Sequence, residues 1–200
     1  MKGDPDLETV QGCLSDDPAL RDASFTQLFE KYKDKVYSTA LRIVGDPSLA
    51  YDAAQETFVT VFEKVHTFHF KAKFSSWLYR IAVNISIDLL RKHSKEPLVV
   101  SEDVGEGSPD GPRWALGDPK SVDPEKIAST KEFESRVQGV IARISEPLRV
   151  VIVLRFANGL SYEEIGEVLE CPVGTVKSRL SRALRALEPL LLPILGSERR

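Results

Sequence analysis

Basic side chains near the C-terminal end form the first group whose chemistry can be read from residue types and spacing. Residues 171–187 contain Lys177, Arg179, Arg182 and Arg185 and no acidic residue. The whole chain has 27 basic and 30 acidic side chains, a formal net charge of −3. A basic segment within an acidic chain is a better sign of nucleic-acid binding than the overall balance. Charge alone still favours the alternative, a solvated helix face.

The residues around this segment predict a scaffold for it. Ser161 and Glu164 have the spacing of a capping box, which would start a short helix that ends near Leu169. Residues 170–172 (ECP) predict a tight turn, and a longer helix is expected from Val173. A short helix, a turn and a longer helix make a helix-turn-helix, the motif that places its second helix in the major groove of DNA.

The longer predicted helix has an apolar face and a polar face. The apolar face is expected to pack against the preceding helices and consists of Val173, Val176, Leu180, Leu184 and Leu187. The polar face consists of Thr175, Ser178, Arg179 and Arg182, with Lys177 on its flank. Hydroxyl and guanidinium groups on such a face can reach base edges and phosphates. Together with the capping box and the turn, this face favours duplex DNA binding over a merely solvated helix.

Aromatic and basic side chains are interleaved in a second segment, residues 66–80. They are Phe68, Phe70, Phe74, Trp77 and Tyr79 with Lys71, Lys73 and Arg80. Unpaired bases stack on aromatic faces while cations follow the backbone, so this composition suits single-stranded DNA. Each aromatic residue taken singly is better explained as core, but Phe68 and Phe70 are expected in a loop, where burial is harder to arrange. Asn84, one helical turn beyond Arg80, is in place to hydrogen-bond an exposed base.

Two carboxylates, Asp52 and Glu56, lie four residues apart on one face of a predicted helix, with Gln55 beside them. As metal ligands or an acid–base pair they would define an enzyme, but none of the 3 histidines is at metal-ligand spacing. Cys13 and Cys171 are too far apart in sequence to indicate a zinc site or a disulfide framework. The sequence therefore predicts no catalytic residue, no metal site and no cofactor.

Length and composition limit the class of protein. The 200 residues (22.3 kDa) leave room for one ordinary domain or two small ones. Hydrophobic residues make up 42% and charged residues 28%, which excludes a wholly disordered chain. Residues 1–6 (MKGDPD) lack the apolar core of a signal peptide, and no apolar stretch is long enough to span a membrane. We expect a cytoplasmic protein without membrane insertion.

The chain divides into three segments of different composition. Residues 1–95 have 13 basic and 13 acidic residues, residues 96–130 have 3 and 8, and residues 131–200 have 11 and 9. The middle segment is rich in proline and glycine and has no helical or strand periodicity, which predicts a flexible acidic linker. Both flanking segments show helical periodicity, so we expect an all-α protein of two small domains, the second with the helix-turn-helix.

Local signals place the expected helices. Ser24 is expected to cap a helix that Gly45 ends in the left-handed conformation, and Pro47 to lie in the first turn of the next helix. The apolar side of that second helix consists of Ala54, Phe58, Val61, Phe62 and Val65. A third helix is expected from about Ser75. In the second domain, a helix is expected over 147–158.

Two pairs of sequence strings resemble one protein family, the extracytoplasmic-function (ECF) sigma factors. Residues 52–58 (DAAQETF) and 74–84 (FSSWLYRIAVN) resemble the promoter-opening domain of that family. Residues 160–166 (LSYEEIG) and 172–180 (PVGTVKSRL) resemble its second domain. The pairs occur in the order found in the family, with a linker between them.

The resemblance implies a subunit of bacterial RNA polymerase that directs the core enzyme to promoters, aids promoter opening and has no catalytic activity of its own. It implies that Asp52, Gln55 and Glu56 dock on the coiled coil of the largest catalytic subunit. The residues that melt and read the −10 element, and capture a flipped base, would be Phe68, Phe70, Lys71, Lys73, Trp77, Arg80 and Asn84. Those that read the −35 element would be Thr175, Lys177, Ser178, Arg179 and Arg182. An anti-sigma factor is a common partner in the family and would have to cover the polymerase-binding or DNA-binding faces.

The sequence departs from the family pattern at several points. Ala53 and Ala54 stand where bulkier or polar residues are common, and the loop 68–73 is not the familiar small, glycine-containing one. Glu170 replaces a usual turn glycine, which implies either a strained turn or an ordinary right-handed conformation. The tail 189–195 (PLLLPIL) is apolar enough to pack on the second domain or on a partner.

A regulator that dimerises on duplex DNA through the same helix-turn-helix is the alternative within the binding proteins. It would require a ligand-binding or phosphorylation domain in residues 1–95 and a dimer face. No acidic cluster of a receiver-type domain occurs there, which counts against it.

Overall fold

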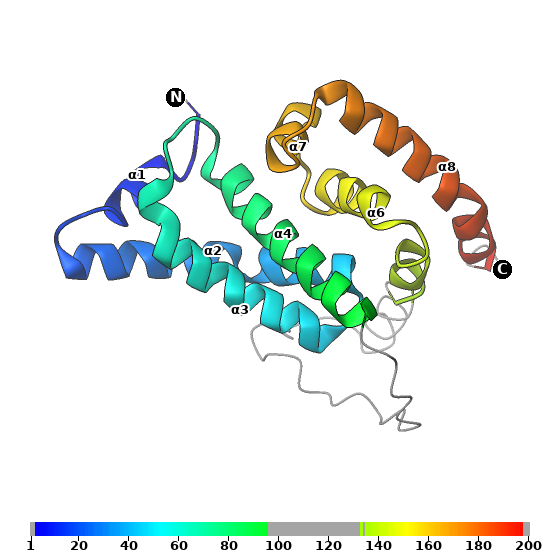
Figure 1. Cartoon of the computed structure of the whole chain (residues 1–200), viewed down its shortest axis with the longest axis horizontal. Coiled ribbons are helices and arrows are strands. Elements are labelled where there is room, and N and C mark those ends of the chain that lie inside the picture. Colours follow the sequence, from blue (N-terminus) through cyan, green and yellow to red (C-terminus); the bar gives the residue numbers. More distant parts are fainter. Residues whose placement is uncertain (1–2, 96–132, 134, 198–200) are drawn as a thin grey trace.

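The computed structural model describes residues 3–95, 133 and 135–197, and every regular element within these ranges is helical (Figure 1). This confirms the predicted all-α class. The predicted linker, residues 96–130, lies outside the described residues. The helices form one group before this gap and one after it, and the two groups lie against each other.

Three long helices make up the first group. They are α2 (Pro18–Val44), α3 (Pro47–Lys64) and α4 (Phe74–Lys95), with the short α1 (Leu7–Gly12) before them and the 3-10 turn η1 (Val65–Thr67) between α3 and α4. The three long helices pack pairwise against one another. Their shared core is apolar and includes Val36, Ala40, Ile43, Val61 and Leu78, all at most 1% exposed. Removal of this surface from water is the main stabilising term.

The predicted turn between the first two long helices is confirmed. Gly45 has φ 81°, the left-handed conformation, and its N–H donates to the Leu41 carbonyl at 2.9 Å. The Asp46 carboxylate then accepts a hydrogen bond from the Leu49 N–H at 2.9 Å and caps α3, with Pro47 in its first turn. These are local signals, so the sequence alone places this turn correctly.

Two details of the first group were predicted wrongly. Ser24 does not start α2, because the helix begins six residues earlier at Pro18, where the Asp17 carboxylate accepts from the Ala19 N–H. An aspartate followed by proline is a complete start signal, so Ser24 falls inside the helix. Phe62, predicted in the core, is 52% exposed and makes an edge contact with Phe25.

The short helix α1 was not predicted, and it belongs to the core of the first group. Its Val10 and the neighbouring Cys13 are at most 3% exposed. Asp6, only 1% exposed, accepts a 2.5 Å hydrogen bond from the Tyr32 hydroxyl and pairs with Lys31. Burial, and next the Asp6 hydrogen bond, raise the pKa of Tyr32 far above its ordinary value, so this hydroxyl remains a donor.

The second group contains the helix-turn-helix. A helix over 135–141 precedes α6 (Glu146–Ile152), which continues as the π-helical turn η2 (Val153–Ala157). The predicted helix over 147–158 is thus one segment with a π-helical end, closed by Gly159 at φ 72°. α7 (Tyr162–Val168) and α8 (Val173–Ser197) follow. Their core is formed by Val151, Leu154, Ile165 and Val176, none of them exposed.

The apolar tail forms the last turns of α8. The helix continues across Pro189 and Pro193, each of which lacks the N–H for an intrahelical hydrogen bond. Packing compensates, because Ile194 is 8% exposed and Leu190 and Leu191 contact the core. Leu192 is 63% exposed. The tail thus packs on its own domain and still presents one large apolar side chain.

The two groups of helices are joined by buried and half-buried polar contacts at the C-terminal end of α2. The Arg149 guanidinium, 8% exposed, donates to the carbonyl of Ile43 at 2.5 Å. The Gln138 amide donates to the carbonyls of Leu41 and Arg42 at 3.1 and 3.2 Å. The last carbonyls of a helix have no partner within it, so residues of the second group cap the end of α2.

Candidate nucleic-acid interface

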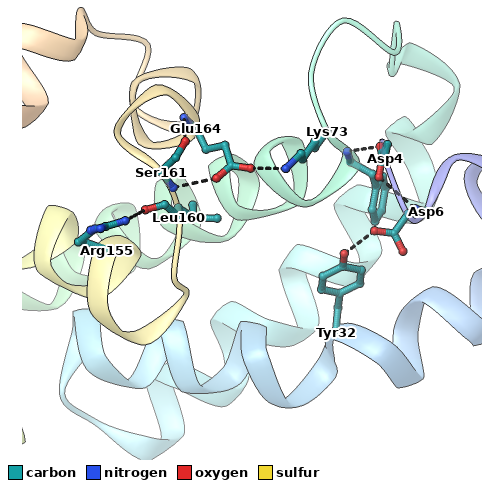
Figure 2. Close-up of polar contacts among 9 residues, drawn as sticks. Asp4, Asp6, Tyr32, Lys73, Arg155, Leu160, Ser161 and Glu164 are labelled. Carbon is teal, nitrogen blue, oxygen red and sulfur yellow. Dashed lines mark hydrogen bonds and ion pairs between the residues drawn. The ribbon is translucent and has the colours of Figure 1, made fainter. Parts of the chain in front are cut away.

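The helix-turn-helix has the predicted start. The Ser161 N–H donates to Glu164 Oε2 at 2.8 Å, and the Glu164 N–H donates to Ser161 Oγ at 3.1 Å, so the capping box is reciprocal (Figure 2). Arg155 donates to the Leu160 carbonyl at 2.8 Å and holds the approach to this cap (Figure 2). The capping box thereby satisfies two backbone N–H groups at the start of α7, those of Ser161 and Glu164.

The turn between α7 and α8 is tight. Glu170 has φ 50°, so of the two conformations that the sequence left open it takes the left-handed one. The Cys171 N–H donates to the Gly166 carbonyl at 3.0 Å, and a Cβ on Gly166 would stand 2.9 Å from the Cys171 carbonyl oxygen. Glycine at 166 therefore permits the close approach that sets the angle between the two helices, and Glu170 carries the strain of a left-handed non-glycine residue.

The buried face of α8 differs from the predicted one at a single position. Val176, Leu180 and Leu187 are at most 6% exposed, but Leu184 is 46% exposed and Ala183 takes its place with no exposure. At about 3.6 residues per turn, one side of the helix carries the side chains at 176, 180, 183 and 187. The side chain at 184 points away from that side.

The predicted −35-reading residues lie together on the exposed side of α8. Lys177, Ser178 and Arg182 are exposed, and Thr175 and Arg179 are half-buried. Ser178 Oγ donates to the Thr175 carbonyl at 3.0 Å, which leaves its lone pairs to accept from a base or a water. None of the ion pairs among the described residues involves these three cations. This face is therefore basic and accessible.

The aromatic residues before and within α4 form one cluster. Phe68 is only 5% exposed, so the expectation that a loop position would resist burial is wrong. Its ring centroid lies 4.9 Å from that of Phe70, 5.9 Å from Phe74 and 5.5 Å from Trp77. The turn η1 folds the loop back onto α4, an effect of tertiary packing that loop composition does not encode. Phe70 (φ 55°) and Trp77 are only half-buried, so their rings remain in reach of a base.

Polar groups surround this cluster. Lys71, Lys73 and Asn84 are exposed and Arg80 is half-buried, all in or beside the start of α4. Asp4 caps α4 from the N-terminal end of the chain. Its carboxylate accepts a 2.8 Å hydrogen bond from the Phe74 N–H (Figure 2). This contact has no local signature in the sequence, because its two residues are 70 positions apart.

The third predicted site is a face of α3. Asp52, Gln55 and Glu56 are all exposed, while Phe58 and Val61 point into the core. Val59, 57% exposed, follows Glu56 by three residues and extends this face with an apolar side chain that the sequence reasoning missed. Among the described residues no group of histidine, cysteine, aspartate or glutamate side chains could hold a metal ion.

Comparison with known families matches both groups of helices. Residues 28–96 match Sigma-70 region 2, and residues 135–187 match Sigma-70 region 4. The ECF RNA polymerase sigma factor SigW of Bacillus subtilis (strain 168) is 36% identical over 168 residues, which cover 84% of this chain and 89% of the relative.

Two solved structures show the same fold. CnrH, in complex with the cytosolic domain of CnrY, has a TM-score of 0.66 at 22% identity and covers 94% of this chain and 97% of that one. The sigma factor RpoE, in complex with the anti-sigma factor NepR from Bartonella quintana, has a TM-score of 0.62 at 24% identity and covers 84% and 96%.

These matches define a transcription initiation factor of the Sigma-70 class. The chain belongs to the extracytoplasmic-function (ECF) RNA polymerase sigma factors. It acts with RNA polymerase in promoter-specific transcription initiation, and this family membership sets aside the dimeric regulator. No helix within the described ranges combines the length and the apolar character needed to span a membrane.

Proposed function

We propose that this chain reads a promoter with two separate surfaces and holds RNA polymerase with a third. The −35 element is bound as duplex by the exposed face of α8, and the −10 element as a single strand beside α4. The observation that carries the proposal is the complete helix-turn-helix, in which a reciprocal cap and a left-handed turn present a basic, accessible face.

On the −35 side, the residues proposed to contact DNA are Thr175, Lys177, Ser178, Arg179 and Arg182. Thr175 and Arg179 are nearest the start of α8, where such motifs touch base edges. Lys177 and Arg182 are exposed and suit phosphates. Free backbone N–H groups at the start of α8 add to the attraction for a phosphate.

On the −10 side, we assign each residue a role according to the exposure of its side chain. Lys71, Lys73 and Arg80 bind phosphates of the strand, and the half-buried rings of Phe70 and Trp77 stack on bases. Asn84 hydrogen-bonds a base. Phe68, which is buried, supports these rings from inside, so its truncation would act through stability.

The α3 face is proposed to dock on the polymerase. Asp52, Gln55 and Glu56 supply charge and hydrogen-bonding groups, and Val59 adds apolar area. Reversal of charge in Asp52→Lys with Glu56→Lys should weaken binding to core polymerase by several kcal/mol, the order of like-charge contacts at interfaces. The matched control is Asp22→Lys with Asp34→Lys on α2, also exposed. Wild-type affinity of the first double variant for core polymerase, by fluorescence anisotropy, would contradict the docking role.

The remaining parts of the proposal concern chemistry and regulation. The chain catalyses no reaction itself and acts in the cytoplasm, where RNA polymerase works. An anti-sigma factor holds it inactive by covering one of the three surfaces. Support for this partner comes from the structurally similar RpoE, whose structure contains the anti-sigma factor NepR.

Run-off transcription with purified core polymerase on genomic fragments tests the proposed function as a whole. Discrete transcripts are expected only when the chain is present, and they should share sequence near −35 and −10. Their absence with an active core enzyme would contradict the proposal. The fragments that respond also supply the promoter DNA for the experiments below.

A further inference from the structure

The −10 side of α4 is occupied in this structure by acidic side chains of α7 and the turn after it. Glu164 and Glu167 lie on α7 and Glu170 lies in the turn after it, and all three side chains pair with cations of the −10 side or line the space beside them. Lys73 Nζ lies 2.7 Å from Glu164 Oε1, and Arg80 Nη1 lies 2.8 Å from Glu170 Oε1. Figure 2 draws the first of these contacts as a dashed line. These three glutamates are called the acidic face of α7 below.

The acidic face also reaches the space beside the aromatic cluster. A cavity of about 220 Å³ lies between the loop before α4 and α7, and Trp77, Arg80 and Glu167 are part of its wall. Carboxylate oxygens accept charge-assisted hydrogen bonds from lysine and arginine as phosphate oxygens do. The acidic face therefore stands where the backbone of a DNA strand would have to lie to reach the same cations.

The ion pairs themselves do not hold the two groups of helices together. The side chains of Lys73 and Glu170 are 50% and 73% exposed, and exposed ion pairs contribute little to stability. The buried contact of Arg149 and the half-buried contacts of Gln138 with the end of α2 are better placed to do so. Lys73 and Arg80 can therefore exchange carboxylates for phosphates without disruption of the core of either group.

We propose that the acidic face of α7 is an internal competitor of the −10 strand, which binds Lys73 and Arg80 in the free chain and is displaced before promoter DNA can bind there. The inference rests on the −10 role proposed for α4. Among the described residues, no carboxylate forms an ion pair with Lys177 or Arg182 of the α8 face, and both side chains are exposed. The free chain is thus competent for duplex binding through α8 but closed to the single strand.

Removal of the competing charges tests this inference. The variant is Glu164→Gln with Glu170→Gln, because glutamine at 164 can still serve the capping box. The matched control is Glu163→Gln, an exposed glutamate of the same helix that takes part in none of the described ion pairs. The probe is a fluorescein-labelled single strand that spans the −10 element of a promoter found by run-off transcription.

The double variant without polymerase should bind this oligonucleotide roughly threefold tighter or more, as expected for the loss of two exposed ion pairs. The control should bind it like the wild type, and all three proteins should bind the −35 duplex alike. Equal affinity of the double variant and the wild type for the oligonucleotide would overturn the inference.

A zero-length carbodiimide cross-link observes the contact directly. In the full-length chain we expect an amide bond between Lys73 and Glu164, found by peptide mass spectrometry, because the two groups are 2.7 Å apart. The −10 oligonucleotide should reduce its yield, and the −35 duplex should not. An unchanged yield at saturating oligonucleotide would also overturn the inference.

The variant Lys73→Ala with Arg80→Ala separates this inference from the proposed function. If holoenzyme with this variant opens promoters like the wild type in permanganate footprinting, the −10 assignment itself fails. If opening is lost while the glutamine variants bind the oligonucleotide no tighter, the −10 assignment stands and the internal competitor is refuted.

Discussion

The two regions proposed to read DNA differ in what surrounds them. The face of α8 that carries Lys177 and Arg182 is exposed, whereas the side of α4 that carries Lys73 and Arg80 is paired with carboxylates of α7. Both conditions arise from one helix-turn-helix, whose first helix is acidic and whose second is basic. Separation of opposite charges onto two adjacent helices lets one motif attract duplex DNA and cover a single-strand surface at once.

Disruption of the aromatic cluster should have the largest effect. Of the two proposed DNA-binding activities, it should abolish only the one at the −10 element. Phe74 is 1% exposed and contacts Tyr32, Phe68 and Trp77. Phe74→Ala should therefore lower the free energy of unfolding by about 3–5 kcal/mol, measured by urea titration. Where the variant remains folded, promoter opening should fail while −35 duplex binding persists. Phe156→Ala, at a 63% exposed ring, should change stability by less than about 0.5 kcal/mol.

Loss of the buried hydrogen bond between Tyr32 and Asp6 should have a smaller effect. Asp6→Ala removes the acceptor of the Tyr32 hydroxyl, which is buried, so the unpaired group should cost about 1–3 kcal/mol of unfolding free energy. Calorimetric melting measures this loss. Glu8→Ala, at an exposed position of α1, is the control. If the two variants melt at the same temperature, the buried Asp6 contact does not stabilise the fold.

Substitutions on the exposed face of α8 should weaken −35 duplex binding and leave the −10 side of α4 unchanged. Arg179→Ala should cost roughly 1–3 kcal/mol of −35 duplex binding and relax sequence preference if Arg179 contacts a base. If it contacts only phosphate, binding to all sequences should weaken alike and the salt slope should fall by about one. Arg143→Ala, at an exposed position in the same group of helices, is the control. Unaltered binding after Arg179 and Arg182 are both changed would show that another face of α8 reads DNA.

The smallest effect concerns pH. The hydrogen bond from Lys73, and next that from the Ser161 N–H, lower the pKa of Glu164 below its ordinary 4.5. A lowered pKa in the folded state means that the contribution to stability is complete above about pH 4.5 and is lost as pH falls through the lowered value.

Solvent screens this pair, so less than about 1 kcal/mol is expected. Urea titrations of the wild type and Glu164→Gln at several pH values would measure the contribution. A difference in unfolding free energy at neutral pH should disappear in acid. A difference that persists in acid would mean that the charge of Glu164 is not its cause.

Local signals carried most of the correct sequence predictions. The capping box of Ser161 and Glu164, the Gly45 turn and the proline at 47 act within a few residues and do not depend on the rest of the chain. The proposed docking face of α3 and the polar face of α8 follow from helical period alone, which is why the residues predicted for each face lie on one side of their helix and are exposed or half-buried.

The errors depended on contacts between distant residues. Phe68 is buried because η1 folds its loop onto α4. Leu184 is an error of another kind, because the helical period itself places Ala183 in the buried row and turns Leu184 away from it. The pairing of Lys73 with Glu164 joins residues 91 positions apart and has no local signature. The helix α1 was missed because its six residues are too few for a periodic pattern.

The cap on the end of α2 has a consequence for how this chain can change over evolution. Gln138 and Arg149 recognise main-chain carbonyls of Leu41, Arg42 and Ile43, so the contact does not depend on which side chains those positions carry. Substitutions at 41 and 42 leave the acceptors of these hydrogen bonds in place, although position 41 is also constrained by packing against the core. If a lineage keeps this junction, we expect glutamine at 138 and arginine at 149 to be retained. Both positions lie in the other half of the sequence from the carbonyls that they bind.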